Sequence, residues 1–577
     1  MTLKNFSLCA VLLFGATMTP ASAATVTEWR AAVDGVITDI LAIHPEPFAK
    51  VGETIWRREA VALQQDLPQL SEPERLARLM QLVAMIGDGH TQIEPADAKY
   101  ASWYPIRLYE FADGVFVTSA HESVSDLAGA EVIEIAGRPV SEVLSLARSL
   151  RGADNEFDGL ERLVVVHNAY LMQALGLAKS DGALNIRVRL QNGRTAQRSL
   201  RPQPVNEELY PYYNNIFNWR YFSEVFGLPF GERSTWTSAY QGLPASAYIE
   251  ADESRPLFLQ RRYAFMKRAL PDQDAYYLYY GQTNYSGMVE FTREAFAEID
   301  AQKPKRLILD IRHNFGGDGS TVPTMVREFV KRQDNPSWEE LYIVTGRKCF
   351  SACLFVIDRF KEQTSVTIVG EPAGASFISY GDATERPYPS IGVNLNVSTL
   401  THLLRESNDY RPFIPVDVPA RVRFADYRNG RDPAVDRIVA GDEMRSLPMI
   451  ALKDGGAAAR RTHLAREREF EDVSWRRPAA EIELRHATDA LLAEERIDDA
   501  IETAMLNTEI NPFIWNTWYN LGIALRRADR TEEAMRSYKC VLMLEPNNWN
   551  REAIEGLFAE QNADPKPAQG CPIGGEE

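Results

Sequence analysis

The chain has 577 residues, enough for roughly four domains of ordinary size. Hydrophobic residues make up 45% and charged residues 25% of it, a composition typical of globular proteins. The formal net charge is -17 and the isoelectric point is about 5.2, so the chain should repel nucleic acids and anionic membranes. We therefore expect no nucleic-acid partner.

Residues 1–24 predict a cleavable signal peptide. Lys4 supplies positive charge, the run LCAVLLFGATM is apolar, and Ala21-Ser22-Ala23 provides the small residues of a cleavage site. The apolar run is too short to span a bilayer as a helix, and no later stretch is apolar for long enough to anchor the chain. We expect a periplasmic or secreted protein whose mature chain has no membrane span.

Four cysteines remain once Cys9 leaves with the signal peptide: Cys349, Cys353, Cys540 and Cys571. An oxidising compartment permits disulfides, and four cysteines allow three connectivities, among which the sequence does not choose. For Cys349 and Cys353 we favour buried, reduced thiols, because a bridge between residues four apart on a helix requires a distorted turn at Ser351. The alternative is that oxidation couples the two cysteines and disturbs the amides beside Ser351, which would make activity redox-sensitive. No H-E-x-x-H or paired C-x-x-C motif indicates zinc.

Residues 25–104 predict helices, because apolar positions recur with helical spacing in WRAAVDGVITDILAI and ERLARLMQLVAMI. The second run ends at the turn 87–89, directly before His90. Residues 105–205 predict short strands with a helical insert at roughly 155–178. The stretch GAEVIEIAGRPVSEVL, a strand, a tight turn and a helix, resembles part of a PDZ domain.

Residues 206–440 predict a domain with alternating strands and helices. Their first part, up to about residue 265, is rich in aromatic residues, has no period and predicts irregular structure. The segments RLILDIR, LYIVTG and SVTIVG then predict buried strands, separated by the helices TVPTMVREFVKR and SACLFVIDRFKE. A strand–helix–strand–helix–strand order favours an α/β fold with right-handed connections.

The C-terminal part contains an internal repeat. Residues 441–483 predict a linker, 484–560 a repeated helix-turn-helix, and 561–577 a disordered tail. Identical residues recur 34 positions apart, namely Ala500 and Ala534, Pro512 and Pro546, and Trp515 and Trp549. The pattern resembles tetratricopeptide repeats, which offer a surface for a protein partner. Only about two repeats fit, so we expect them to pack on the preceding domain.

Three clusters carry residues suited to hydrolytic chemistry: GDGHT at 87–91, DIRHNFGG at 310–317 and GRKCFSAC at 346–353. Ser351 lies where a strand turns into a helix, whose N-terminus presents free N–H groups and partial positive charge. A serine there can attack a carbonyl while amides hold the resulting oxyanion. Taken alone, Ser351 is explained more simply as a helix cap.

The other two clusters allow the same two interpretations. Gly316 and Gly317 let the backbone turn sharply and expose an amide to a ligand, although most Gly-Gly loops are only turns. His90 is a candidate base on a polar loop, or merely a turn residue.

The combination and order of GDGHT, LILDIRHNFGG, GRKCFSA and VGEPAGASFISYGD resemble the C-terminal-processing and tricorn-core family of serine peptidases. HPEPFAKV, YRPFIPVDV and GRDPAVD also fit its bacterial members, so the resemblance covers roughly residues 25–440. It implies a crotonase-like β/α catalytic core beside a PDZ-like domain.

The resemblance also implies site residues. One branch of the family uses a lysine about 25 residues after the serine, but this chain has Ser376 there. The tricorn-like branch matches, with Ser351 as nucleophile, His90 as base and Asp409 as orienting acid, for which Glu406 is the fallback. The implied oxyanion donors are the amides of Gly316 or Gly317 and of Ala352. Gly89 is a departure, because the tricorn-like site has a serine directly before the histidine.

We therefore expect an exported serine peptidase that hydrolyses peptide bonds in peptide or protein substrates by a Ser–His mechanism. No metal and no organic cofactor are implied. Two alternatives remain, since a fold does not by itself determine function. One is a catalytically inactive, peptide-binding protein on a peptidase fold, and the other is an envelope scaffold in which the repeats carry the main function.

Overall fold

The computed structural model describes residues 23–100, 102–158, 161–204, 236–239, 265–283, 287–332, 340–364, 366–404, 412–440, 444–473, 475, 481–566 and 570–571. Nearly all of the expected signal peptide and most of the irregular stretch 206–265 lie outside these residues. So do Asp409 and Glu406.

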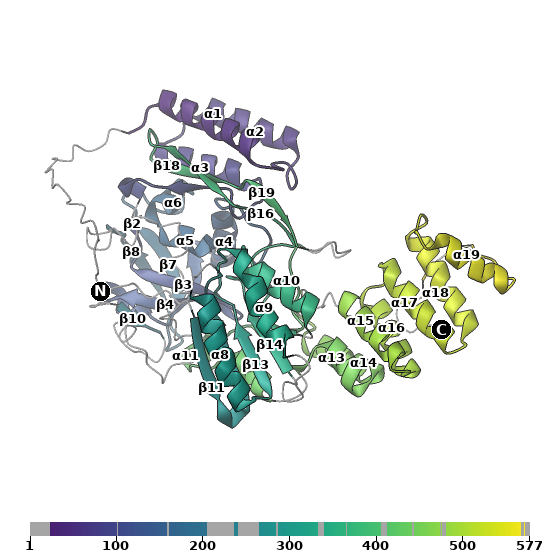
Figure 1. The fold of residues 1–577 in the computed structure, drawn as a ribbon. Coiled ribbons are helices and arrows are strands. Elements are labelled where there is room, and N and C mark those ends of the chain that lie inside the picture. The colour runs from purple at the N-terminus through teal and green to yellow at the C-terminus, as the bar shows by residue number, and fades with distance from the viewer. Residues whose placement is uncertain are drawn as a thin grey trace, which may run out of the picture.

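Three helices form a layer at the top of Figure 1: α1 (Val26–Ile43), α2 (Glu53–Asp66) and α3 (Glu72–Ala84). Helix α1 begins at a capping box, in which the side chains of Thr25 and Glu28 each accept the other's backbone N–H. Beneath the helices lies an antiparallel sheet of three strands, β1 (Gln92–Pro95), β18 (Val393–Val397) and β17 (Thr384–Tyr388). This three-stranded sheet joins the N-terminal part of the chain to a segment about 300 residues later.

A second sheet occupies residues 106–239. Its central order is β10-β4-β5-β7-β8, with β3 beside β4 and β6 beside β5. The strands are β3 (Ile106–Phe111), β4 (Gly114–His121), β5 (Glu131–Ile135), β6 (Arg138–Pro139), β7 (Leu184–Arg189), β8 (Thr195–Leu200) and β10 (Trp236–Ser238). Helix α4 (Val140–Arg148) follows β6, and α5 (Glu161–His167) and α6 (Ala169–Ala174) form the expected helical insert. The short strands β2 (Ser102–Trp103) and β9 (Gln203–Pro204) pair with each other.

A six-stranded sheet, ordered β11-β12-β13-β14-β15-β20, carries the alternation expected after residue 270. Its strands are β11 (Phe265–Leu270), β12 (Ala275–Tyr280), β13 (Arg306–Asp310), β14 (Glu340–Thr345), β15 (Thr367–Gly370) and β20 (Val418–Pro419). All neighbours are parallel except the antiparallel pair β11 and β12. The loops that follow β13 and β14 therefore meet at one edge of the sheet.

Helices cover both faces of this six-stranded sheet. One face packs against α8 (Met288–Gln302), α9 (Val322–Val330) and α10 (Cys353–Gln363), where Phe296, Phe329 and Phe360 meet edge to face. The other face, including Tyr342, packs against Ile438 of α12 (Pro433–Ala440). The structure confirms the strand–helix alternation that the sequence predicts.

Seven helices follow towards the C-terminus and extend to one side of the molecule (Figure 1). They are α13 (Leu447–Asp454), α14 (Gly456–Glu469), α15 (Glu481–Ala493), α16 (Ile497–Ile510), α17 (Trp515–Arg527), α18 (Thr531–Leu544) and α19 (Arg551–Glu560). Helices α13 and α14 lie in the segment 441–483 that we expected to be a linker. Leu447 and Ile450 of α13 are buried with Leu484 of α15 and Leu506 of α16.

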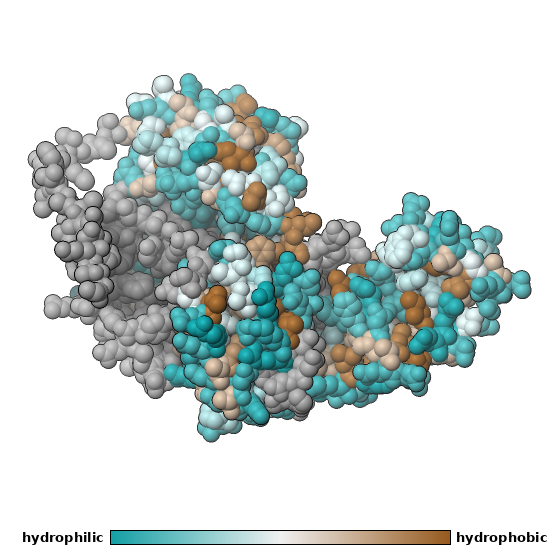
Figure 2. Space-filling view, in the orientation of Figure 1, coloured by the Kyte–Doolittle hydropathy of each residue, from teal (hydrophilic) through white to brown (hydrophobic). Residues whose placement is uncertain are grey.

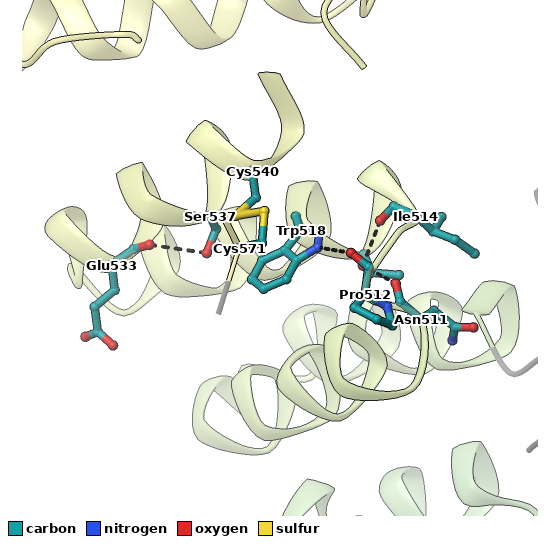
Figure 3. Close-up of a disulfide and its surroundings, with 9 residues drawn as sticks. Asn511, Pro512, Ile514, Trp518, Glu533, Ser537, Cys540 and Cys571 are labelled. Carbon is teal, nitrogen blue, oxygen red and sulfur yellow. Dashed lines mark hydrogen bonds between the residues drawn. A yellow bond between two sulfur atoms is a disulfide. The ribbon is translucent and has the colours of Figure 1, made fainter. Parts of the chain in front are cut away.

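Two disulfides are present, Cys349–Cys353 and Cys540–Cys571. In Figure 3, Cys571 reaches Cys540 on α18, so a disulfide ties the segment after α19 back to that helix. Nearby, Trp518 Nε1 donates to the carbonyl oxygen of Pro512 at 2.8 Å. The expectation that Cys349 and Cys353 are reduced is wrong for this structure.

On the face shown in Figure 2, hydrophobic residues form small separate patches among hydrophilic ones. Within the described ranges, no helix is long and apolar enough to cross a bilayer.

Candidate active site

Ser351 lies in the loop between β14 and α10 and has a backbone φ of +53°. This left-handed conformation is uncommon for a residue other than glycine. The Cys349–Cys353 disulfide encloses the turn, and its Cα atoms are 5.4 Å apart. The distorted turn at Ser351 brings the two cysteines within bridging range, which is why the expectation of reduced thiols fails.

The glycine loop after β13 packs directly against Ser351. The Phe350 N–H donates to the carbonyl oxygen of Asn314 at 3.1 Å, which joins the two loops. A Cβ added to Gly316 would lie 2.7 Å from Ser351 Cβ and 2.8 Å from the Ala352 nitrogen. Only glycine allows this close approach, and its φ of +97° also favours glycine.

The same loop presents an amide to the site. The Gly316 N–H donates to Asn314 Oδ1 at 2.8 Å, and the Gly316 carbonyl oxygen accepts from the Thr283 N–H at 3.1 Å. Because a trans peptide points its C=O and N–H in opposite directions, the Gly317 N–H faces away from Thr283. Among the described residues, neither the Gly317 nor the Ala352 N–H has a hydrogen-bond acceptor. Unlike the Gly316 N–H, these two N–H groups are therefore not already used within the described part of the chain.

His90 follows α3 on the loop 87–91, and its ring packs on that of Phe350 with centroids 4.5 Å apart. The His90 N–H donates to Asp88 Oδ1 at 2.9 Å, and the ring Nδ1 lies 3.9 Å from the same oxygen. Burial lowers the pKa of His90 below its ordinary value, and the negative charge of Asp88 opposes that shift. The imidazole is therefore neutral near pH 7 and able to accept a proton.

Asp88 is the buried carboxylate that supports this loop, and no role was predicted for it from the sequence. Burial alone would raise the pKa of Asp88, but hydrogen bonding with His44 and the nearby His90 bring it well below its usual range. Its Oδ2 also accepts from Thr91 Oγ1 at 2.5 Å and from Ser398 Oγ at 2.6 Å. The sequence feature that could have indicated a role for Asp88 was its place inside the GDGHT motif, two residues before the histidine.

Gly89 leaves room for the aromatic ring beside the site. A Cβ at Gly89 would lie 2.7 Å from Phe350 Cζ, so a serine cannot occupy this position while Phe350 keeps its place. The Gly89 N–H donates to Asp154 Oδ1 at 2.9 Å, and burial raises the pKa of that carboxyl to about 7. Ser376, at the position of the dyad lysine, is buried and donates to the Asp154 carbonyl oxygen at 3.0 Å.

Ser351 and His90 line the same cavity, whose volume is about 1010 Å³. Gly317 and Ala352 line it as well. The structure thus brings together the predicted nucleophile, the predicted base and two of the predicted oxyanion amides. Gly316 lies behind them, against Ser351.

A second histidine–carboxylate pair, which the sequence analysis missed, lines this cavity. His402 Nε2 lies 2.8 Å from Asp382 Oδ2. His402 belongs to β19 (Leu400–Leu403), which pairs with β16 (Ile378–Gly381), and Asp382 follows β16 directly. Only the pairing of these two strands brings the side chains together, and no local sequence pattern marks it. In the described part of the chain, no group of three or more His, Cys, Asp or Glu residues is arranged to hold a metal ion.

Comparisons with protein-family models and with curated proteins found no match. Among solved structures, a mutant of CPAF is similar, with a TM-score of 0.51 and 13% identity over 72% of this chain and 96% of that chain. Mature CPAF complexed with lactacystin has a TM-score of 0.49 and 12% identity, covering 72% of this chain and 98% of that chain. The tricorn protease has a TM-score of 0.32 and 14% identity, covering 72% of this chain and 36% of that chain.

At these identities the similarity concerns the fold alone, and we conclude nothing from the two structures with TM-scores below 0.5. The chain is a mixed helix-and-sheet protein that has the fold of the CPAF mutant over 72% of its length.

Proposed function

We propose that this chain is an exported serine peptidase that hydrolyses peptide bonds, with Ser351 as nucleophile and His90 as base. One observation carries the proposal: Ser351 and His90, which are 261 positions apart in the sequence, line one cavity together with Gly317 and Ala352. The fold shared with the CPAF mutant is consistent with it.

The reaction follows from these groups. The Ser351 hydroxyl attacks the carbonyl carbon of the scissile peptide while neutral His90 takes its proton. The N–H groups of Gly317 and Ala352 donate to the oxyanion that forms. His90 then gives the proton to the leaving amine, and the acyl group remains on Ser351. Water attacks the acyl-enzyme in the same way, with His90 as base, and releases the second product.

We propose Asp88 as the orienting carboxylate. Asp409 remains an alternative proposal for that role and lies outside the described residues. The Asp88 carboxylate is buried, accepts a hydrogen bond from the backbone N–H of His90 and lies 3.9 Å from the ring Nδ1. A charge at that distance stabilises the imidazolium that forms during attack. Ser398 and Thr91 hold the carboxylate in place through hydrogen bonds to its other oxygen.

The remaining parts of the proposal concern the flanking segments. Export rests on the signal-peptide pattern of residues 1–24, and the two disulfides suit an oxidising compartment. The tetratricopeptide assignment is supported by α16 and α18, which have equal lengths and begin 34 residues apart. The PDZ-like assignment is supported by the strands β5 and β6 followed by α4.

Peptide cleavage is tested with a mixed peptide library whose products are identified by mass spectrometry. Wild type should yield new termini that Ser351→Ala does not, and the exposed Ser145→Ala on α4 should behave as wild type. An inactive peptide-binding protein is the second candidate, favoured by the 3.9 Å separation of His90 Nδ1 and Asp88, which is longer than a hydrogen bond. Retention of peptides without any Ser351-dependent cleavage would select that candidate.

A further inference from the structure

The three-stranded sheet has one apolar and one polar face, and the polar face lines the cavity. On the apolar face, Ile93 of β1 and Leu395 of β18 are buried in the hydrophobic core. Since side chains alternate along a strand, their neighbours point the other way. Gln92 of β1 pairs with Asn396 of β18, which pairs with Glu385 of β17, so these three side chains form a row across the sheet. All three line the cavity that holds Ser351, as does Glu94, two residues along β1.

Gln92 presents an unused hydrogen-bond acceptor. Its side-chain Nε2 donates to Glu94 Oε1 at 3.1 Å, which fixes the direction of the amide group. Within the described part of the chain, no donor reaches Gln92 Oε1, although the residue is only 5% exposed. A buried oxygen without a donor is unfavourable, so this position suits a ligand that brings an N–H group.

The charges around the row favour a cationic donor. Four carboxylates line the cavity: Glu94, Asp318, Asp382 and Glu385. Arg359 is the only arginine or lysine among the described lining residues, and Glu362 already pairs with it at 2.6 Å. A cavity with this excess of negative charge attracts cations and disfavours anions.

We propose that Gln92, Glu94, Glu385 and Asn396 form a subsite for an arginine or lysine side chain of the peptide substrate. This inference rests on the proposed peptidase function and adds a substrate class to it. Arginine fits best, because its planar guanidinium offers five N–H donors to a surface built of carboxylates and amide oxygens. The subsite lies in the same cavity as Ser351, so a bound cationic side chain holds the peptide beside the nucleophile.

The test uses pairs of fluorogenic peptides that differ only by arginine or citrulline, with the residue placed in turn at each position around the cleaved bond. Citrulline has nearly the same shape but no charge. At one position, kcat/KM for the arginine peptide should exceed that for its citrulline partner roughly tenfold, the size of a charge-assisted hydrogen bond. The ratio should fall as salt is added.

Two variants and a control locate the effect. Glu94→Gln and Glu385→Gln should each reduce the arginine-to-citrulline ratio towards one. Glu142→Gln, which removes the same charge from an exposed position on α4 away from the cavity, should leave the ratio at its wild-type value. Equal ratios in wild type and both subsite variants would overturn the inference.

Binding to Ser351→Ala, measured by fluorescence anisotropy with the same peptides, separates this inference from the proposed function. If Ser351→Ala prefers the arginine peptide but wild type cleaves nothing, the subsite stands and the peptidase proposal fails. If wild type cleaves through Ser351 without preferring arginine at any position, the peptidase proposal stands and the subsite is wrong.

Discussion

Replacing Gly316 by alanine should disable catalysis while the chain still folds. The added methyl carbon would lie 2.7 Å from Ser351 Cβ and 2.8 Å from the Ala352 nitrogen and the Phe350 carbonyl oxygen, whereas ordinary contacts begin at 3.4 Å. The two loops must therefore move apart by roughly 0.7 Å, and a misplacement of about 1 Å in an active site costs about 100-fold in rate. We expect kcat/KM to fall by about that factor.

The stability cost of Gly316→Ala has two parts, the strain of the left-handed backbone and the close contacts of the added methyl group. The φ of +97° at Gly316 disfavours any residue with a Cβ, by about 1–2 kcal/mol. Gly193→Ala is the matched control, because Gly193 has a φ of +80° in the turn between β7 and β8 and nothing within 4 Å of an added Cβ. It should show only this backbone cost in thermal unfolding, a smaller loss than that of Gly316→Ala, and it should keep its kcat/KM. Wild-type kcat/KM in Gly316→Ala would refute the proposed packing of the two loops.

Three further predictions concern the base, the disulfide beside Ser351 and the C-terminal helices. In wild type, kcat/KM should rise with pH and level off below the ordinary histidine pKa of about 6.5, because burial lowers the pKa of His90 and the neutral ring is the base. A rise in kcat/KM that continues above pH 7, or full activity in His90→Ala, would indicate another base. Replacing Cys349 and Cys353 together by serine should lower kcat, because the bridge encloses the turn at Ser351. If wild type has the same kcat with and without reductant, and the double variant has the kcat of wild type, the bridge has no role in catalysis. Leu506→Ala should lower the free energy of unfolding by about 2–4 kcal/mol, because the Leu506 side chain of α16 is buried against α13, while the exposed Leu464→Ala should change it little. Equal denaturation midpoints for the two variants would show that this contact adds little stability. Normal folding of both a chain truncated after residue 475 and the isolated segment that follows it would show that α15–α19 fold independently.

The central alternation of strands and helices was predictable because each element has its own local pattern of apolar residues. The apolar runs of β13, β14 and β15 are separated by helices with a clear apolar face, and parallel pairing follows from their order. The loops after β13 and β14 then had to meet at one edge, which brought Gly317 near Ser351.

Contacts between distant segments were not predictable in the same way. The pairing of Gln92 with Asn396 and the hydrogen bond from Ser398 to Asp88 join residues about 300 positions apart, and no periodicity encodes them. The Cys349–Cys353 bridge was only the less favoured of two alternatives for a different reason. We assumed a regular helical turn between the cysteines, whereas Ser351 adopts a left-handed conformation.

The most direct test of the account is the site of covalent modification by a fluorophosphonate, which reacts with an activated serine. The labelled protein is digested and its modified peptide is sequenced by mass spectrometry, for wild type and for His90→Ala. The account predicts a single adduct on Ser351 in wild type and a rate of labelling lower by orders of magnitude in His90→Ala. An adduct on another serine, or no adduct on folded wild type, would contradict it.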